Sequence, residues 1–275
     1  MTRAARTRLR AAASLAIVAW SLLPVAWIAS LSVRPGPDLA ARTFLPGRLT
    51  LEHYRVVLSS PLFLEALRNS VGVSLLATAA SVGLAAPAAW AVARLAFPGR
   101  RLVLWTALAV STFPAVALVS PLFDLWRRTG LYDTWPGLVL AHLTFGVPLA
   151  LWILTAFFRE VPRGPEQAAR LEGAAGWQVF RHVTLPLAAP GLFTAAILVF
   201  LASWNDFLFG ISLTSTGRAR PVPAALAFFS GGSQFQEPAG AIAAAAVLVT
   251  VPVVALVLAF QRRIVAGLTA GAVKG

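Results

Sequence analysis

The chain has 275 residues, of which 58% are hydrophobic and 12% charged, and its mean hydropathy is +0.77. Soluble domains carry about a quarter charged residues, so this composition excludes an ordinary soluble domain and predicts a polytopic membrane protein. The net charge of +13 does not indicate nucleic-acid binding, because the arginines lie between apolar runs, where orientation and contact with lipid headgroups explain them. Cysteine is absent, and His53, His142 and His182 lack ligand spacing, so we expect no disulfide and no metal site.

The first predicted element is an N-terminal membrane anchor. Four arginines lie between Met1 and Arg10, and an apolar run follows over residues 11–31. A span needs about 20 apolar residues, whereas the apolar part of a secretory signal has about 7–15. We therefore expect a first transmembrane helix that is retained in the protein.

Five further apolar runs follow this one. They cover about residues 69–93, 102–123, 135–158, 187–213 and 239–260. No alternating barrel pattern is visible, and only helices or closed barrels satisfy the backbone inside lipid. We therefore expect an all-α fold with six transmembrane helices in a single domain over residues 1–275. Pro114 and Pro148 lie inside the third and fourth runs and permit bends there.

The distribution of basic residues predicts the orientation. An even number of spans places both termini on one side, and that side carries 14 lysines and arginines against nine on the other. The positive-inside rule then puts both termini and the loop at residues 160–186 in the cytoplasm. The longest outer connection, residues 32–68, contains four prolines and a possible short surface helix over residues 51–58.

The polar segment at residues 160–190 stands out between two apolar runs. Pro165 suits the first turn of a short helix, and Gly173 falls where that helix would end. Trp177, Phe180 and Thr184 then recur at i, i+3 and i+7, which predicts a second short helix with one bulky face. Physical reasoning leaves two alternatives: a docking element for another protein, or an amphipathic loop on the headgroups.

The fifth run ends in Trp204-Asn205-Asp206-Phe207. A carboxylate near the hydrocarbon is costly, so Asp206 should face protein or a water-filled path. In one interpretation the two aromatic rings stack on sugars while Asn205 and Asp206 bind hydroxyl groups, which makes these four residues substrate-path candidates. In the other, Asn205 and Asp206 join the helix to a partner subunit and Trp204 is an interfacial anchor.

A family resemblance rests first on the polar loop. Its residues match the EAA–G–I–LP spacing of permease subunits of binding-protein-dependent ABC importers, at Gln167-Ala168-Ala169, Gly173, Val183, Leu185 and Pro186. In that family the loop docks into the ATPase subunit. The resemblance implies these coupling residues: Glu166, Gln167, Ala168, Ala169, Glu172, Gly173, Ala174, Val183, Leu185 and Pro186. The usual Glu is Gln167 here, which cannot form an ion pair, and Glu172 stands where the carbohydrate branch usually has Asp.

Two further segments carry the same resemblance. Residues 204–207 resemble the fifth-helix signature of carbohydrate-importer permeases, and residues 267–275 resemble the closing sequence of the maltose-type inner permease. The resemblance implies the type I ABC importer permease fold and translocation of a sugar or oligosaccharide in the bacterial cytoplasmic membrane. The implied partners are a second homologous permease, a homodimeric ATPase that binds ATP and Mg²⁺, an extracytoplasmic solute-binding protein and membrane lipid.

The outer loop at residues 214–238 combines glycines with aromatic and amide side chains. We expect it to contact the docked solute-binding protein through Phe228, Phe229, Gln234 and Phe235. A simple connector is the alternative.

The chain contains no Gly-x4-Gly-Lys-Ser/Thr phosphate loop and no catalytic triad. We therefore expect no catalytic residues and no cofactor in this chain, and ATP hydrolysis in a separate subunit. Among importers, a permease for a polyol or glycerol phosphate is the alternative. An ion-coupled secondary transporter is the alternative from another class, but it would place several ionisable residues in mid-span. Here Asp206 is the only acidic candidate, and it lies near the end of its run. The chain also lacks the clustered acids, clustered histidines or Ser nucleophile motif that an integral membrane enzyme would need.

Overall fold

The computed structural model describes residues 3–39, 43–229 and 239–270. These residues are helical or irregular, with no strand among them. The described chain divides into two compact units, one within residues 1–64 and 226–254 and the other within residues 65–225 and 255–275. The expected all-α fold is confirmed, whereas a single permease domain over residues 1–275 stays a prediction.

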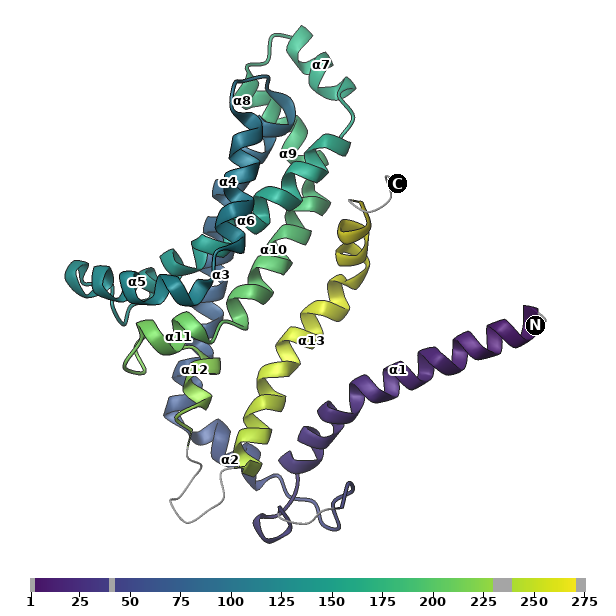
Figure 1. The fold of residues 1–275 in the computed structure, drawn as a ribbon, viewed down its shortest axis with the longest axis vertical. Helices are drawn as coiled ribbons and strands as arrows, with labels where there is room; N and C mark the ends of the chain where they lie inside the picture. Colours follow the sequence, from purple (N-terminus) through teal and green to yellow (C-terminus); the bar gives the residue numbers. More distant parts are fainter. Residues whose placement is uncertain (1–2, 40–42, 230–238, 271–275) are drawn as a thin grey trace. The chain divides into compact units, whose positions relative to one another are not determined.

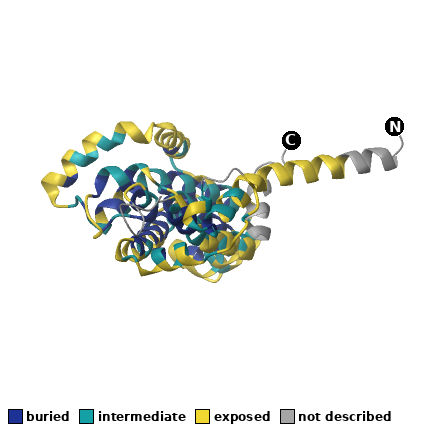
Figure 2. Ribbon diagram, turned by 90° about the horizontal axis from the view of Figure 1, so that it is seen from below, coloured by how far each residue is buried: buried dark blue, intermediate teal, exposed yellow. Residues whose placement is uncertain are grey.

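Four long helices each contain a segment that is long and apolar enough to cross a membrane. They are α1 (Arg3–Ser32), α3 (Pro61–Arg94), α6 (Trp135–Glu160) and α13 (Ala239–Ala270) (Figure 1). The first, second, fourth and sixth apolar runs lie within them. Figure 2 shows α1 exposed, and every residue from 10 to 26 of it is in the exposed class. An apolar helix with this exposure is suited to lipid or to another subunit.

The third apolar run forms two helices, α4 (Arg100–Thr112) and α5 (Ala115–Thr129), which meet at 89°. The break lies at Phe113-Pro114, where Phe113 is extended with ψ 131°. Proline has no N–H and disfavours a helical conformation in the residue before it. The bend that Pro114 permits in the run over residues 102–123 is therefore present as a sharp break, and the bent pair together is apolar enough for one span.

The fifth apolar run is also broken. After a 76° bend near Ala188, α10 covers Ala189–Trp204, and α11 covers Leu208–Leu213. Asp206 lies in the gap between these helices, and its Oδ2 accepts a hydrogen bond from the Gly210 N–H at 3.1 Å. This side chain satisfies a free backbone donor at the start of α11. The expected single helix over residues 187–213 is therefore corrected to two helices, α10 and α11, with a gap at residues 205–207.

Buried Arg34 organises the first unit. Its Nη2 donates to the Phe44 carbonyl at 2.8 Å, and its guanidinium carbon lies 4.9 Å from the Trp27 ring centre. The Arg34 carbonyl lies 2.7 Å from His53 Nε2 on α2 (Glu52–Ser59). The predicted short helix over residues 51–58 is confirmed as α2, and a single 3₁₀ turn, η1 (Gly36–Asp38), precedes it.

The second unit has two apolar clusters, of which the first lies between α3, α4, α6 and α10. Figure 2 colours buried residues dark blue. Ala85, Ala89 and Trp90 of α3 meet Leu154 and Phe158 of α6 in the first cluster. Small residues on α3 allow close helix packing, which stabilises helix contacts inside lipid. The second cluster lies toward α5 and α11, and α12 (Val222–Leu226) follows it along the chain.

Candidate functional site

The polar loop forms a small helical element at one end of the second unit, beyond the ends of α3 and α6 (Figure 1). It consists of four pieces: α7 (Gly164–Leu171), α8 (Gly176–Val179), the π-helical η2 (Phe180–Thr184) and α9 (Leu185–Leu187). We call this element, residues 160–187, the coupling loop.

The two predicted boundaries of α7 are confirmed. Pro165 lies in its first turn, and Gly173 follows its end with φ +91°. The Ala174 N–H donates to the Ala169 carbonyl at 2.9 Å, and the Gly173 N–H donates to the Arg170 carbonyl at 3.1 Å. This pair of bonds is the Schellman motif, which needs a left-handed residue at the position of Gly173.

Glu166 fastens the coupling loop to the helix bundle. Its Oε1 lies 2.8 Å from Nε of Arg94, the last residue of α3, and the two side chains are only 6% and 3% exposed. Thr184 Oγ1 of η2 donates to the same Glu166 oxygen at 3.0 Å, and Arg94 Nη2 donates to the Val161 carbonyl at 2.6 Å. One carboxylate therefore joins α3, α7 and η2, and Arg94 adds the end of α6.

The opposite face of α7 is exposed. Gln167 and Ala168 are exposed there, and Leu171, one turn further along the same face, is 91% exposed. Trp177 of α8 is 58% exposed, whereas Phe180 and Thr184 are buried, so the three residues do not form the single predicted face. Sequence reasoning missed Leu171, although its i+4 spacing from Gln167 was a usable signal.

The remaining predicted coupling residues are distributed around this element. Glu172 and Pro186 are exposed, whereas Ala169, Ala174, Val183 and Leu185 are half-buried. The π-helical bond from the Leu185 N–H to the Phe180 carbonyl was not predicted. Pro186 has no N–H to donate to the carbonyl four residues before it, so one α-helical hydrogen bond is necessarily absent here.

The four residues at the end of the fifth run lie in different environments. Trp204 is 3% exposed, and its ring stacks on Phe200 with centres 5.5 Å apart. Asn205 is exposed and donates to the Leu201 carbonyl at 2.8 Å. Phe207 is 48% exposed. Trp204 is thus a buried packing residue within this chain rather than an interfacial anchor, and Phe207 is the aromatic side chain that can contact a ligand.

A buried polar chain surrounds Asp206. Its Oδ2 lies 3.3 Å from Nε2 of His142 on α6, and His142 Nδ1 lies 2.6 Å from Ser203 Oγ on α10. His142 is 2% exposed and the Asp206 side chain 12% exposed. The cost of a carboxylate at this depth is offset by a partner inside the same chain, which sequence reasoning did not predict.

The outer-loop candidates are only partly described. Phe228 is 53% exposed and Phe229 is 8% exposed. Gln234 and Phe235 lie outside the described residues. Among the residues whose structure is described, no group of three or more His, Asp or Glu side chains is arranged to hold a metal ion.

Several helices long and apolar enough to cross a membrane, with a helical loop held by a buried ion pair, define the class of multi-pass helical membrane proteins. Residues 81–269 match the family described as the binding-protein-dependent transport system inner membrane component. The chain belongs to this family. It is therefore a multi-pass transport component of the membrane.

Curated relatives match along nearly the whole chain. The trehalose transport system permease protein SugB of Mycobacterium tuberculosis is 52% identical over 259 residues, which is 94% of each chain. The trehalose/maltose transport system permease protein MalG of Thermococcus litoralis is 38% identical over 256 residues, 92% of each chain. The crystal structure of a bacterial ABC transporter involved in alginate import has a chain with TM-score 0.81 and 23% identity, covering 95% of this chain and 98% of that one, which shows the shared fold.

Proposed function

We propose that this chain is the transmembrane permease subunit of an ATP-driven importer that translocates a sugar or oligosaccharide delivered by an extracytoplasmic binding protein. The observation that carries the proposal is the coupling loop, which Arg94 and Glu166 clamp to the bundle while Leu171 stays exposed. Such an element transmits force because its inner face is fixed and its outer face is open to a partner.

The proposed partner at the exposed face is the ATPase. The coupling loop moves with the ATPase when ATP and Mg²⁺ bind there, and the buried ion pair passes that displacement to α3. The bundle then alternates between inward-open and outward-open states, which ATP can drive only through different binding free energies for the two states. This chain supplies no catalytic residue and binds no nucleotide in this scheme.

The proposal also includes the assembly and its orientation. A second homologous permease lines the other side of the path, two identical ATPase subunits lie below, and the solute-binding protein docks outside near Phe228. Both termini and the coupling loop lie in the cytoplasm, in agreement with the excess of arginines on that side.

A carbohydrate is the favoured substrate class because the printed names of the relatives include trehalose and maltose. Phe207 offers an exposed ring for a sugar face, next to the hydrogen-bonding groups of Asn205 and Asp206. Polyol or glycerol phosphate import is the second candidate, favoured by the arginines in the outer connections.

Reconstitution in proteoliposomes tests the proposal. The chain is assembled with the second permease, the ATPase and the binding protein, and uptake of labelled trehalose is measured with ATP inside or outside the vesicles. We expect uptake only when ATP is on the ATPase side, and none when the ATPase is omitted. Uptake driven by a proton or sodium gradient without nucleotide would instead establish the secondary transporter.

A further inference from the structure

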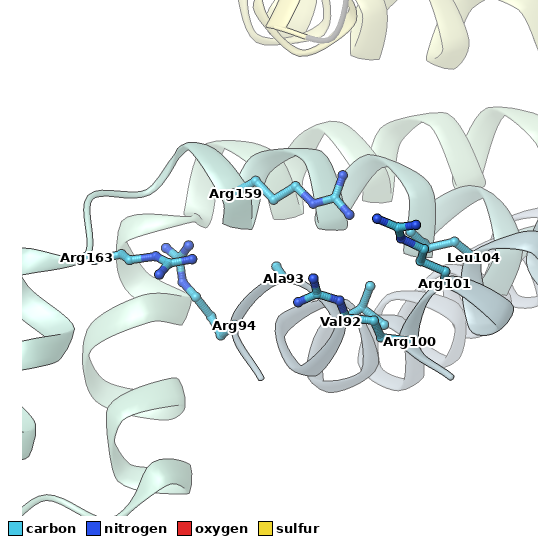
Figure 3. Close-up of a pocket in the computed structure, with 8 residues that line it drawn as sticks. All are labelled: Val92, Ala93, Arg94, Arg100, Arg101, Leu104, Arg159 and Arg163. Carbon is cyan, nitrogen blue, oxygen red and sulfur yellow. The ribbon is translucent and has the colours of Figure 1, made fainter. Parts of the chain in front are cut away.

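A cavity of about 540 Å³ lies beside the coupling loop and is lined mainly by arginines. Its walls are Val92, Ala93, Arg94, Arg100, Arg101, Leu104, Arg159 and Arg163. In Figure 3 the guanidinium groups of Arg100, Arg101 and Arg159 extend toward the middle of this space. No acidic residue lines it.

Three helix ends bring these residues together. Arg94 ends α3, and the five-residue turn to Arg100, which closes on Gly99 in the left-handed conformation (φ +85°), starts α4 beside it. Because α4 packs along α6, Arg159 near the end of α6 reaches the same space. Arg163 directly precedes α7. The cavity is therefore built by the fold, because its lining residues run from Val92 to Arg163 in the sequence.

Most of this positive charge has no counter-charge among the side chains that the structure describes. In the described structure, Arg94–Glu166 is the contact within 4 Å between an arginine or lysine and a carboxylate. The four other arginines of the cavity are exposed and form no ion pair. Like charges held close together repel one another, and an anion bound between them would remove that cost.

The chemistry of the cavity favours a phosphate group. Guanidinium groups bind phosphate oxygens in pairs and with defined geometry. The first turn of α4, a helix of 13 residues, begins at Arg100 and Arg101, so its free backbone N–H groups and its dipole also favour an anion at this place.

Apolar surface continues from the cavity along α4. Leu102 is 68% exposed and Trp105 is 66% exposed, and Val110 further along the helix is 44% exposed. A site with arginines at a helix end and apolar residues plus tryptophan beyond it matches the two parts of a phospholipid, the charged headgroup and the acyl chains. Inorganic phosphate has no apolar group that could contact the side chains along α4.

We propose that this cavity binds the phosphate headgroup of an anionic phospholipid, with the acyl chains along the exposed face of α4. The lipid would neutralise the arginines beside the buried clamp of the coupling loop. This site is separate from sugar translocation, and its binding can be measured whether or not the substrate assignment is correct.

Native mass spectrometry of the purified transporter complex in detergent tests the proposal, with phosphatidylglycerol or phosphatidylethanolamine added. We expect saturable binding of phosphatidylglycerol in preference to phosphatidylethanolamine. A basic residue near an anionic headgroup contributes about 1 kcal/mol, or about fivefold in affinity. The double variant Arg100→Gln/Arg101→Gln should therefore bind phosphatidylglycerol about 25-fold more weakly.

The matched control is Arg127→Gln/Arg128→Gln, which removes an adjacent arginine pair at the end of α5, outside the cavity. It should change the affinity by less than twofold. The single variant Arg159→Gln, with an expected loss of about fivefold, tests the site if the double variant does not fold.

Three outcomes would overturn the proposal. Equal binding by the wild-type complex and by the folded Arg100→Gln/Arg101→Gln or Arg159→Gln variants would show that the lipid lies elsewhere. Displacement of phosphatidylglycerol by an equal concentration of inorganic phosphate would identify a soluble anion as the ligand. If the arginine variants no longer associate with the ATPase but bind phosphatidylglycerol as the wild type does, the occupant of the cavity would be an acidic segment of a protein.

Discussion

Arg94 and Glu166 are 72 positions apart in the sequence, yet Arg94 Nε lies 2.8 Å from Glu166 Oε1 in a nearly water-free contact. Arg94 ends a candidate membrane span, and Glu166 lies in the first turn of α7. Two charges are removed from water here only because each satisfies the other and Thr184 adds a hydrogen bond. The coupling loop is therefore fastened to the bundle at a defined point.

Glu166→Gln should strongly destabilise this point. The amide oxygen can still accept hydrogen bonds, but the Arg94 charge is left buried without a counter-charge. Breaking one side of a buried ion pair costs about 3–5 kcal/mol, so we expect a lower midpoint of thermal unfolding in detergent and loss of ATP-coupled uptake. Glu172→Gln is the matched control, because it removes the same charge from an exposed position of the same loop. Similar midpoints for both variants would contradict the clamp.

Gly173→Leu should uncouple ATP hydrolysis from uptake. A left-handed conformation costs a non-glycine residue about 1–2 kcal/mol, and no atom lies within 4 Å of an added Cβ. The chain itself therefore tolerates the bulk, and the larger effect should come from a docked ATPase. Ala169→Asp, on the same α7 element, is expected to uncouple as well.

Gly130→Leu provides the control for backbone strain, since Gly130 also has a positive φ, of +73°, and open space around it. ATPase activity and uptake are measured on the same vesicles. If Gly173→Leu behaves like Gly130→Leu in the ratio of uptake to hydrolysis, close approach of a partner at Gly173 is ruled out.

Phe207→Ala and Trp204→Ala should separate a substrate contact from a packing residue. Trp204 is buried, and truncating a buried tryptophan costs about 3–5 kcal/mol, so this variant should lower the unfolding midpoint. Phe207 is about half exposed, and its removal should leave the midpoint unchanged while it changes the sugar concentration for half-maximal uptake. A Phe207 variant with wild-type uptake kinetics would exclude it from the path.

Local sequence signals predicted both ends of α7. Pro165 and Gly173 act through their own backbone preferences, and these do not depend on distant residues. The apolar runs were predictable for the same reason, since length and hydropathy alone decide whether a helix can span a membrane.

Contacts between distant residues decided what could not be predicted. Glu166 faces inward because Arg94 arrives from another helix, and the gap around Asp206 is stabilised by His142 on α6. Pro148 is accommodated inside α6, whereas Pro114 marks an 89° break. One proline thus lies within a continuous helix and the other at a break, because the proline alone does not decide whether a helix continues and tertiary packing contributes.

Deletion of residues 231–236 should abolish uptake while leaving assembly with the ATPase intact. The reason is the proposed contact of this outer loop with the solute-binding protein, in which Phe228 lies at the edge of the deleted stretch. Co-purification of the ATPase and uptake are measured in parallel. Normal uptake by the deletion variant would remove the proposed role of this loop.

The position of Leu171 tests the central claim most directly, and the absence of cysteine from the chain makes the test clean. A Leu171→Cys variant is treated with a membrane-impermeant maleimide in intact cells and in inverted membrane vesicles, with Leu58→Cys as the outer-side control. We expect Leu171→Cys to react only in inverted vesicles, and to be protected there when the ATPase is bound. Reaction of Leu171→Cys in intact cells would place the coupling loop outside and would contradict its role as the docking site of an ATP-driven motor.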